Sequence, residues 1–426
     1  MTIALFIAFT IFVALNTPIS LALGLASLAG LMYEGRMPFI LIPQKMFTGV
    51  DSFVLLAVPL FVLAGNLMDT GGISRRLIAV ASRLVGHLRG GLGQVVIVSM
   101  IFFSGLSGSS TADTAAVGSV CIPAMVKKGY RRELATSIVA AAGGMGILIP
   151  PCINMVVYAI IAEVSIAGIF LAGFLPGFLM GFCLMVYMYL RARKENYPTE
   201  PKASWREVRV AMKEAIFPLL TPVIIMGGIL SGVFTVTESA AIAVAYAFVL
   251  SVFAYKELKF SQLPEVLIST ASTTGVVMML LGMASIFGWI LAHQRIPHMV
   301  GESISSISTQ PWVFLLIVNV LFLIVGCFMD PLPAIVILVP ILLPVALQLG
   351  INPIHFGIVL IANLGIGFIT PPVGNVLFVA CSIGEVSISS VIVYLLPFIG
   401  VMIVALALIT FIPEISLFLP RLLGYL

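Results

Sequence analysis

The sequence predicts an all-α polytopic membrane protein built from two inverted repeats. Three observations predict it: an apolar composition, few charges, and a long-range internal similarity. Of the 426 residues, 61% are hydrophobic and 9% are charged, and the mean hydropathy is +1.21. Soluble domains carry about 25% charged residues, so this composition excludes a soluble enzyme, a disordered chain and a nucleic-acid-binding protein. At about 20 residues per span, the length allows roughly ten membrane crossings and no large soluble domain.

Apolar runs separated by polar or Gly/Pro segments give the expected elements. Residues 3–32 are expected to form one span, broken near Pro18. The segment Ser74–Gly90 alternates basic and apolar residues, which is typical of an amphipathic helix at the membrane surface. The polar stretch 191–215 is interpreted as a linker between two halves. The other expected spans and hairpins are 52–68, 92–126, 134–162, 166–190, 216–234, 236–255, 265–292, 311–348, 350–383 and 388–412.

The positions of the basic residues predict the orientation. Cytoplasmic loops of membrane proteins carry an excess of Lys and Arg. The loop 127–132, the linker 191–215 and the pair Lys256 and Lys259 are the most basic connections. Two expected spans separate each of these loops from the next, so a single orientation places all of them in the cytoplasm.

The run 92–126 is expected to form a re-entrant hairpin. It is too long for one crossing and short for two, and basic residues flank both of its ends. Its middle, Ser104–Ser110, is small, polar and a poor helix former. We therefore expect the chain to enter from the cytoplasm and turn inside the membrane. Such a turn is tolerated only where it is buried in protein or lines a water-filled cavity.

An internal repeat is the strongest pattern in the chain. The motif 146–151 (Gly-Ile-Leu-Ile-Pro-Pro) matches 367–372 (Gly-Phe-Ile-Thr-Pro-Pro) at a separation of 221 positions. The same separation pairs Pro123 with Pro344, Gly129 with Gly350, Asn154 with Asn375, and Pro176 with Pro397. These matches predict a first repeat over 1–190 and a second over 216–426.

The two repeats are expected to have opposite orientations in the membrane. Five expected spans lie between the matched loops at Gly129 and Gly350, and an odd number reverses the direction of the second copy. The second hairpin, 311–348, should therefore open to the outside. Inverted repeats whose broken helices, here 134–162 and 350–383, meet near the midplane are typical of secondary transporters.

The two Pro-Pro segments are candidates for binding a cation. Proline has no N–H and cannot continue a helix, so carbonyl oxygens near each break need other partners. Na⁺ accepts such oxygens together with Ser and Thr hydroxyls. The first candidate site combines Ser104 and Ser107 with the break 146–151, and the second combines Gly326 with the break 367–373. The alternative is a pair of proline kinks packed by small residues, without an ion. Helix N-termini at the breaks would favour an anionic substrate.

Acidic residues inside the membrane are further candidates, because they are costly there and are usually functional. Asp113 follows the first hairpin turn, Asp330 lies in the second, and Glu238 begins a span. Asp51 and Asp69 are expected at the membrane–water interfaces, where they would be solvated.

Enzyme activity is not predicted. The segment 105–108 (Gly-Leu-Ser-Gly) resembles the G-x-S-G motif of intramembrane serine proteases, and a protease is the distant alternative. A serine nucleophile needs a base within hydrogen-bond reach, and His355 is the one histidine expected within the membrane. No nucleotide-binding motif is present in the sequence, so ATP is not expected to drive this subunit.

Taken together, the chain resembles the large membrane subunit of the tripartite ATP-independent periplasmic (TRAP) transporters, the DctM-like permeases. The resemblance covers essentially the whole chain. Its most specific segments are 59–65 with 68–72, the hairpin turn 104–116, the two Pro-Pro motifs 146–151 and 367–374, and 234–241.

This resemblance implies Na⁺-coupled uptake by an elevator mechanism in the bacterial inner (cytoplasmic) membrane. The implied partners are a small membrane subunit, a periplasmic substrate-binding protein and the surrounding membrane lipid. The implied substrates are organic acids such as C4-dicarboxylates, sialic acid or sugar acids. A start at Met1 directly before the first span implies that the small subunit is a separate chain. A stand-alone ion-coupled carboxylate transporter, which needs no binding protein, is the nearest alternative.

The resemblance also implies two sodium sites, several of whose residues would bind through backbone carbonyls. The first site would contain Ser104, Ser107, Gly146, Ile149 and Pro151. The second would contain Gly326, Gly367, Thr370 and Val373.

Overall fold

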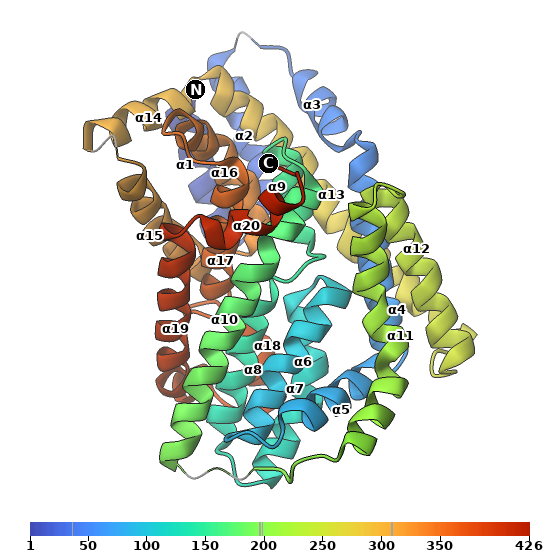
Figure 1. The fold of residues 1–426 in the computed structure, drawn as a ribbon. Coiled ribbons are helices and arrows are strands. Elements are labelled where there is room, and N and C mark those ends of the chain that lie inside the picture. Colours follow the sequence, from blue (N-terminus) through green and yellow to red (C-terminus); the bar gives the residue numbers. More distant parts are fainter. Residues whose placement is uncertain (36, 196, 198, 308–309) are drawn as a thin grey trace.

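The computed structural model describes residues 1–426 apart from 36, 196, 198 and 308–309. Helices form the framework of the described residues (Figure 1). Eight helical segments among them are long and apolar enough to cross a membrane. They are Phe53–Thr70, Ile166–Glu195, Trp205–Leu230, Val236–Ala254, Phe260–His293, Pro311–Phe328, Pro331–Gln348 and Ile388–Phe411. Shorter apolar helices among the described residues are Thr2–Ala14, Ile19–Glu34, Gly91–Ser107, Pro353–Gly367 and Asn375–Gly384.

The N-terminal run 3–32 forms a hairpin, so its prediction as a single span is wrong. Helix α1 (Thr2–Ala14) and helix α2 (Ile19–Glu34) pack side by side, with Leu5 against Gly30. The chain reverses because Asn16 adopts a left-handed conformation (φ 59°) and Pro18 stands at the N-cap of α2. Proline is well tolerated at a helix start, where its missing N–H would have no partner within the helix.

The rest of the first half contains the expected hairpin and the expected broken helix. Helix α5 is the predicted amphipathic helix, and it buries Leu77 and Val80. It lies across the lower end of the molecule (Figure 1). The bounds are α3 (Leu41–Val50), η1 (Phe53–Leu56), α4 (Ala57–Thr70), α5 (Ile73–Val85), α6 (Gly91–Ser107), α7 (Ser110–Lys127), α8 (Arg132–Gly146), α9 (Ile153–Ile161) and α10 (Ile166–Glu195).

The linker between the halves is shorter than the predicted 191–215. Helix α10 continues to Glu195, and α11 (Trp205–Leu230) begins behind a capping box formed by Ser204 and Glu207. A capping box satisfies two backbone N–H groups at a helix start, so the polar residues after 204 initiate a helix. Glu200 holds the remaining linker against the first hairpin through an ion pair with Lys128.

The second half repeats the order of the first. After α11 come α12 (Val236–Val249), η2 (Leu250–Ala254), η3 (Phe260–Gln262), α13 (Leu263–His293), α14 (Ile296–Ile307), α15 (Pro311–Phe328), α16 (Pro331–Gln348), α17 (Pro353–Gly367), α18 (Asn375–Gly384), α19 (Ile388–Phe411) and α20 (Glu414–Leu422). The sequence analysis did not predict the helices α3, α14 and α20. Each contains polar or proline residues that lower its apparent hydropathy.

Helix bounds recur between the halves at the spacing seen in the sequence. The first and last residues of α16 lie 221 positions after those of α7, and the same holds for α17 and α8. The hairpin α6–α7 opens toward the lower end of the molecule, and α15–α16 opens toward the upper end (Figure 1). The two repeats are therefore inverted.

Helices α8 and α17 cross at two glycines, which are also separated by 221 positions. A Cβ atom on Gly144 would lie 2.6 Å from the Gly365 carbonyl oxygen, and one on Gly365 would lie 2.4 Å from the Gly144 carbonyl oxygen. Real Cβ atoms do not approach so closely, so both positions require glycine. This reciprocal contact brings the two Pro-Pro breaks into the centre of the molecule.

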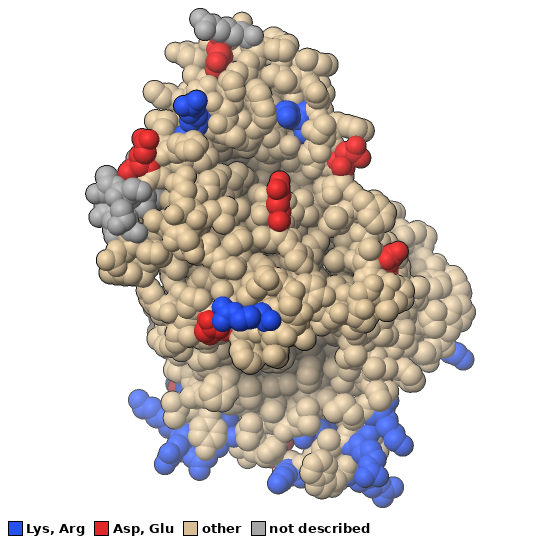
Figure 2. Space-filling view, turned by 45° about the horizontal axis from the view of Figure 1, so that its top comes forward, with Lys and Arg blue, Asp and Glu red and all other residues tan. Residues whose placement is uncertain are grey.

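The two ends of the molecule differ in their charged side chains. Most of the Lys and Arg side chains in view gather at the lower end, while Asp and Glu side chains are scattered over the upper face together with a few basic ones (Figure 2). Ion pairs tie the basic end together, including Arg76–Glu257 and Arg132–Glu385. The positive-inside rule places this end in the cytoplasm. Both chain termini lie toward the opposite end (Figure 1).

Candidate functional site

A cavity of about 570 Å³ lies where the two hairpin turns meet. Its wall combines both hairpins, both helix breaks, the α1–α2 turn and the middle of α13. Within the part of the chain that the structure describes, Asp330 is its one charged lining residue, and no Lys, Arg or His lines it. The lining residues are Pro18–Ser20, Gly108–Thr111, Ile153, Asn154, Ser272, Thr273, Val276, Val277, Leu280, Asp330–Pro333, Phe368 and Asn375. The cavity is thus polar on the hairpin side and open to the surroundings, because Asp330 in its wall is exposed.

The first hairpin turns over fewer residues than predicted. Helix α6 includes Ser104–Ser107, so the expected non-helical stretch 104–110 is reduced to Gly108 and Ser109. Gly108 has φ +65°, a conformation that favours glycine. The Ser109 hydroxyl accepts the backbone N–H of Ala112 and caps α7.

Behind this turn, the two predicted serines share one carboxylate. Ser104 Oγ donates to Oδ2 of Asp113 over 3.0 Å, and Ser107 Oγ donates to its Oδ1. Asp113 is fully buried. Gly146 packs directly against this group, because a Cβ there would lie 2.3 Å from Ser104 Oγ. Ser104, Ser107 and Gly146 are therefore brought together as predicted, with Asp113 as an additional member.

The first helix break packs against the same turn. Helix α8 ends at Gly146 and α9 begins at Ile153, and the bond between Pro150 and Pro151 is cis. Both prolines lack an N–H, and the Gly146 carbonyl instead accepts the N–H of Ile149. A Cβ on Gly108 would lie 3.0 Å from the Pro151 carbonyl oxygen. The Pro151 carbonyl thus lies at the hairpin turn next to Ser107, and the buried Ile149 belongs to the same break.

The second turn and the second break also touch, backbone to backbone. A Cβ on Gly367 would lie 2.5 Å from the Gly326 Cα. The backbone N–H of Val373 donates to the Cys327 carbonyl over 3.1 Å. The Thr370 hydroxyl donates to the Ile366 carbonyl over 2.7 Å. The four predicted residues of this site, Gly326, Gly367, Thr370 and Val373, therefore lie on two segments that are in direct contact.

A second, smaller cavity of about 120 Å³ lies beside this contact. Gly326 and Val373 line it, and Asp330 supplies its carboxylate. The Asn375 side chain donates from Nδ2 to Oδ1 of Asp330. Each half therefore combines a hairpin turn, a Pro-Pro break and one carboxylate.

The donor chemistry of both groups fits a hard cation such as Na⁺. A hydroxyl has one proton, and those of Ser104, Ser107 and Thr370 are donated within the protein. The oxygen atoms of Ser104 and Thr370 therefore keep lone pairs for a cation, and Ser107 Oγ keeps one beside the pair that accepts the Ser109 N–H over 3.1 Å. Among the residues that the structure describes, no three His, Cys, Asp or Glu side chains converge on one point. Hydroxyl and carbonyl oxygens, with one carboxylate each, are thus the ligands that these segments offer.

Two other predicted acids have different surroundings. Glu238 was expected to be a functional acid within the membrane, but it is exposed and completes a capping box with Thr235 at the start of α12. A local capping function explains it, because its carboxylate accepts the Thr235 backbone N–H. Asp69 is half-buried in α4 rather than solvated at an interface.

The histidine needed for a protease has other partners. His355 bonds through Nδ1 to Ser416 Oγ over 2.7 Å, and its Nε2 lies 3.3 Å from the Thr410 carbonyl oxygen. Ser107 is bonded to Asp113 instead. Nothing in this arrangement pairs Ser107 with a histidine base.

Sequence reasoning missed several cavity residues. Asn154 and Asn375 served only as markers of the repeat, yet both line the central cavity. Ser272 and Thr273 lie in the middle of α13, where hydroxyls in an apolar span could have been a signal. The α1–α2 turn at Pro18 gave a signal that was interpreted only as a kink.

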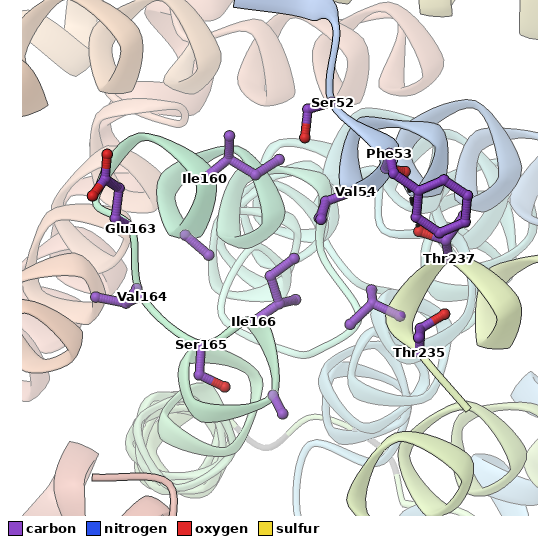
Figure 3. A pocket seen from close by; sticks show the side chains of 13 residues that line it. Ser52, Phe53, Val54, Ile160, Glu163, Val164, Ser165, Ile166, Thr235 and Thr237 are labelled. Atoms are coloured by element: carbon purple, nitrogen blue, oxygen red, sulfur yellow. Dashed lines mark hydrogen bonds between the residues drawn. The ribbon is translucent and has the colours of Figure 1, made fainter. Parts of the chain in front are cut away.

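A third cavity, of about 560 Å³, lies between the α9–α10 connection and the starts of α4 and α12 (Figure 3). Ile160, Val164 and Ile166 line one side, and Ser52, Phe53 and Thr235 line the other (Figure 3). None of the predicted site residues lines it. The central cavity is therefore the better candidate for the functional site.

Comparison with known proteins agrees with this geometry. Residues 6–415 match the family described as the tripartite ATP-independent periplasmic transporter, DctM component. The chain belongs to this family. It is 39% identical to the C4-dicarboxylate TRAP transporter large permease protein DctM of Rhodobacter capsulatus, over 96% of each chain. It is 41% identical to the sialic acid TRAP transporter large permease protein SiaM of Vibrio cholerae, again over 96% of each chain.

The fold is shared more widely than the sequence. The YdaH transporter of Alcanivorax borkumensis, whose topology is described as unusual, aligns with a TM-score of 0.66 at 16% identity. The alignment covers 96% of this chain and 98% of that one. The chain is thus a multi-span TRAP large permease of the bacterial inner membrane, with a helical transporter fold.

Proposed function

We propose that this TRAP permease uses Na⁺ to import an organic acid that a periplasmic binding protein delivers. The observation that carries the proposal is the central cavity, which lies between two inverted hairpin turns and two Pro-Pro breaks. The relatives named for C4-dicarboxylates and sialic acid support an organic acid as the substrate.

Helix starts around the cavity support an anionic substrate. Helices α7, α9, α16 and α18 begin at or beside residues that line it. Their N-terminal N–H groups and positive dipole ends attract negative charge. Because no basic side chain lines the cavity, these dipoles and the coupling cations would compensate the charge of the substrate.

Na⁺ bound at the two sites would supply positive charge beside the cavity. Ser104, Ser107, Gly146, Ile149 and Pro151 would hold one ion, and Gly326, Gly367, Thr370 and Val373 the other. Each set joins a hairpin turn to a helix break, so an occupied site would hold the two segments together. The energy source would be the Na⁺ gradient, without ATP.

An elevator movement is the proposed route across the membrane. The two breaks are locked together through Gly144 and Gly365, which makes α6–α10 and α15–α19 suited to move as one body. The helices α4, α11, α12 and α13 would form the static part. The hairpin turns and helix breaks that line the cavity would then travel with the mobile body, while the wall formed by α13 would stay in place.

A small membrane subunit and a binding protein are the proposed partners. The family is tripartite, and helix α11 has only a third of its apolar window buried within this chain. A further membrane subunit could cover that surface. A binding protein would concentrate the substrate at the outer face.

Uptake in proteoliposomes tests the proposal. The permease with its small subunit, binding protein and an inward Na⁺ gradient should accumulate the cognate organic acid, and ATP should make no difference. Permease alone should give negligible uptake, and so should the complete system without a Na⁺ gradient. Robust uptake by the permease alone would favour a stand-alone carrier, and uptake without Na⁺ would refute the proposed coupling.

A further inference from the structure

The central cavity and the smaller cavity share one wall. Ile19, Asp330, Phe368 and Asn375 line both of them. Asp330 is the one charged residue in either lining. Its carboxylate therefore lies between the place proposed for the second cation and the place proposed for the organic anion.

Asn375 is already bonded to that carboxylate. Its Nδ2 donates to Oδ1 of Asp330, and Asn375 is the first residue of α18, at a helix start beside the cavity. In a cavity without Lys, Arg or His, a side-chain amide is one of few donors that can reach an anion. While Asp330 holds this amide, one of its donor positions is not available to a substrate.

The negative charge of Asp330 also opposes an anion directly. Like charges repel each other, and a nearby cation offsets that repulsion. The empty second site therefore disfavours the substrate in two ways, by repulsion and by occupation of a donor. A cation beside Asp330 would relieve both.

We propose that the Asp330–Asn375 pair couples cation binding to anion binding, an inference that rests on the proposed function. When a cation occupies the smaller cavity, the Asp330 carboxylate bonds to it in place of Asn375. The Asn375 amide is then free to donate to the carboxylate of the substrate. Without the cation, the pair re-forms and the anion is excluded.

The first half carries no equivalent pair. The positions 221 residues earlier are Ser109 and Asn154, neither of which is charged. Asn154 has its Nδ2 3.6 Å from Cys152 Sγ, and its buried Oδ1 has no partner in the structure. The acid of the first half, Asp113, is fully buried and does not line the cavity. The coupling switch is therefore a property of the second half.

If Asn375 and the cation compete for Asp330, replacing Asn375 and replacing Asp330 should change the cation affinity in opposite directions. Asn375→Ala removes the competitor, so the cation should bind more tightly, by roughly threefold. Asp330→Asn removes the carboxylate, so the cation should bind at least roughly tenfold more weakly. A merely structural pair would weaken binding in both variants. Asp51→Asn changes an exposed acid outside both cavities and is the control, which should leave the Na⁺ affinity unchanged.

The measurement is Na⁺ titration of the thermal unfolding of the purified permease, with K⁺ as the control cation. The proposal is overturned if Asn375→Ala weakens the Na⁺ effect or if Asp330→Asn leaves it unchanged. A second measurement uses uptake by the complete three-component system. Asn375→Ala should lower uptake although it binds Na⁺ more tightly, and normal uptake would refute the role of its amide. Because the Na⁺ titration needs no substrate, it remains decisive even if the proposed transport function fails.

Discussion

The two halves of the permease place their carboxylates differently around otherwise matching hairpins. In the first half, Asp113 lies behind the turn and accepts hydrogen bonds from Ser104 and Ser107. In the second half, Asp330 lies on the turn and faces the central cavity. The position equivalent to Asp113 is Ala334, and the one equivalent to Asp330 is Ser109. The two hairpins share a backbone arrangement, but their carboxylates stand at different positions.

This difference separates two tasks that a coupled transporter must perform. A carboxylate buried behind two serines can fix hydroxyl oxygens for a cation without meeting the substrate. A carboxylate on the cavity wall is exposed to both solutes. The first half is therefore suited to holding a cation, and the second to making the substrate depend on one.

The largest expected effect concerns the inversion itself. A cysteine replacing Lys128, beside the first hairpin, should react with a membrane-impermeant maleimide only after permeabilisation. A cysteine replacing Gln310, beside the second hairpin, should react in intact cells. Labelling in a background without the five native cysteines measures this, and that background alone is the control. Labelling of both positions from one side would remove the basis of the comparison.

The glycines at the two sites should differ in tolerance. Gly367→Ala would bring a Cβ to 2.5 Å from the Gly326 backbone, which cannot move aside without separating the turn from the break. We expect more than roughly a hundredfold loss of Na⁺ affinity and a lower Tm, since overpacking costs about 1–3 kcal/mol and the site would open as well.

At Gly146 the added methyl group would meet a side chain, Ser104 Oγ, which can rotate. Gly146→Ala should therefore weaken Na⁺ binding less than Gly367→Ala does. Gly400→Ala, where an added Cβ meets nothing within 4 Å, is the control. Equal losses at Gly146 and Gly367 would show that the two sites are built alike. Na⁺ titration of thermal unfolding measures all three variants.

Removing the buried charge of the first half should have the next largest effect. Asp113→Asn keeps the size of the side chain but loses the charge and one acceptor for the serine hydroxyls. Hydrogen bonds to charged groups contribute about 1.5–3 kcal/mol, so Na⁺ affinity should fall by roughly ten- to a hundredfold. The exposed Asp51, replaced by Asn, is the matched control. An unchanged Na⁺ titration would exclude Asp113 from the first site.

The smallest expected effect is at Thr370. Thr370→Ala removes one hydroxyl from a site that retains backbone oxygens and Asp330. Loss of a single ligand costs about 1–3 kcal/mol, so the Na⁺ concentration for half-maximal transport should rise by about tenfold. Thr370→Ser keeps the hydroxyl and should restore the wild-type value. An Ala variant with a normal Na⁺ curve and normal membrane expression would contradict a side-chain role.

The sequence alone predicted those features that depend on local chemistry or on the similarity between the two halves of the chain. The consecutive prolines at 150–151 and 371–372 interrupt a helix because neither residue supplies an N–H, and the fixed spacing between the two motifs aligned the two halves. The same local reasoning placed Ser104 and Ser107 near Gly146. It also separated the amphipathic α5 from the spans, because its basic and apolar residues alternate.

Features that depend on tertiary contacts could not be predicted in this way. An apolar run such as 3–32 gives no sign of whether Pro18 kinks a span or reverses the chain, since both keep the side chains in an apolar environment. Asp113 was visible as an acid, but its serine partners are set by the packing of α6 against α7. The wall formed by Asp330 and Asn375 joins residues 45 positions apart, so no local motif reveals it.

The crossing of Gly144 and Gly365 has a consequence for how such a chain can vary. A residue beside an axis of approximate two-fold symmetry faces its own counterpart, so any side chain there would collide with a copy of itself. Enlarging one partner cannot be offset by shrinking the other, because the other is already glycine. Equivalent positions away from this axis do not face each other and can diverge, as Asp113 and Ala334 have done. At the axis both copies must keep glycine. The side chains around this fixed contact can differ between the two halves.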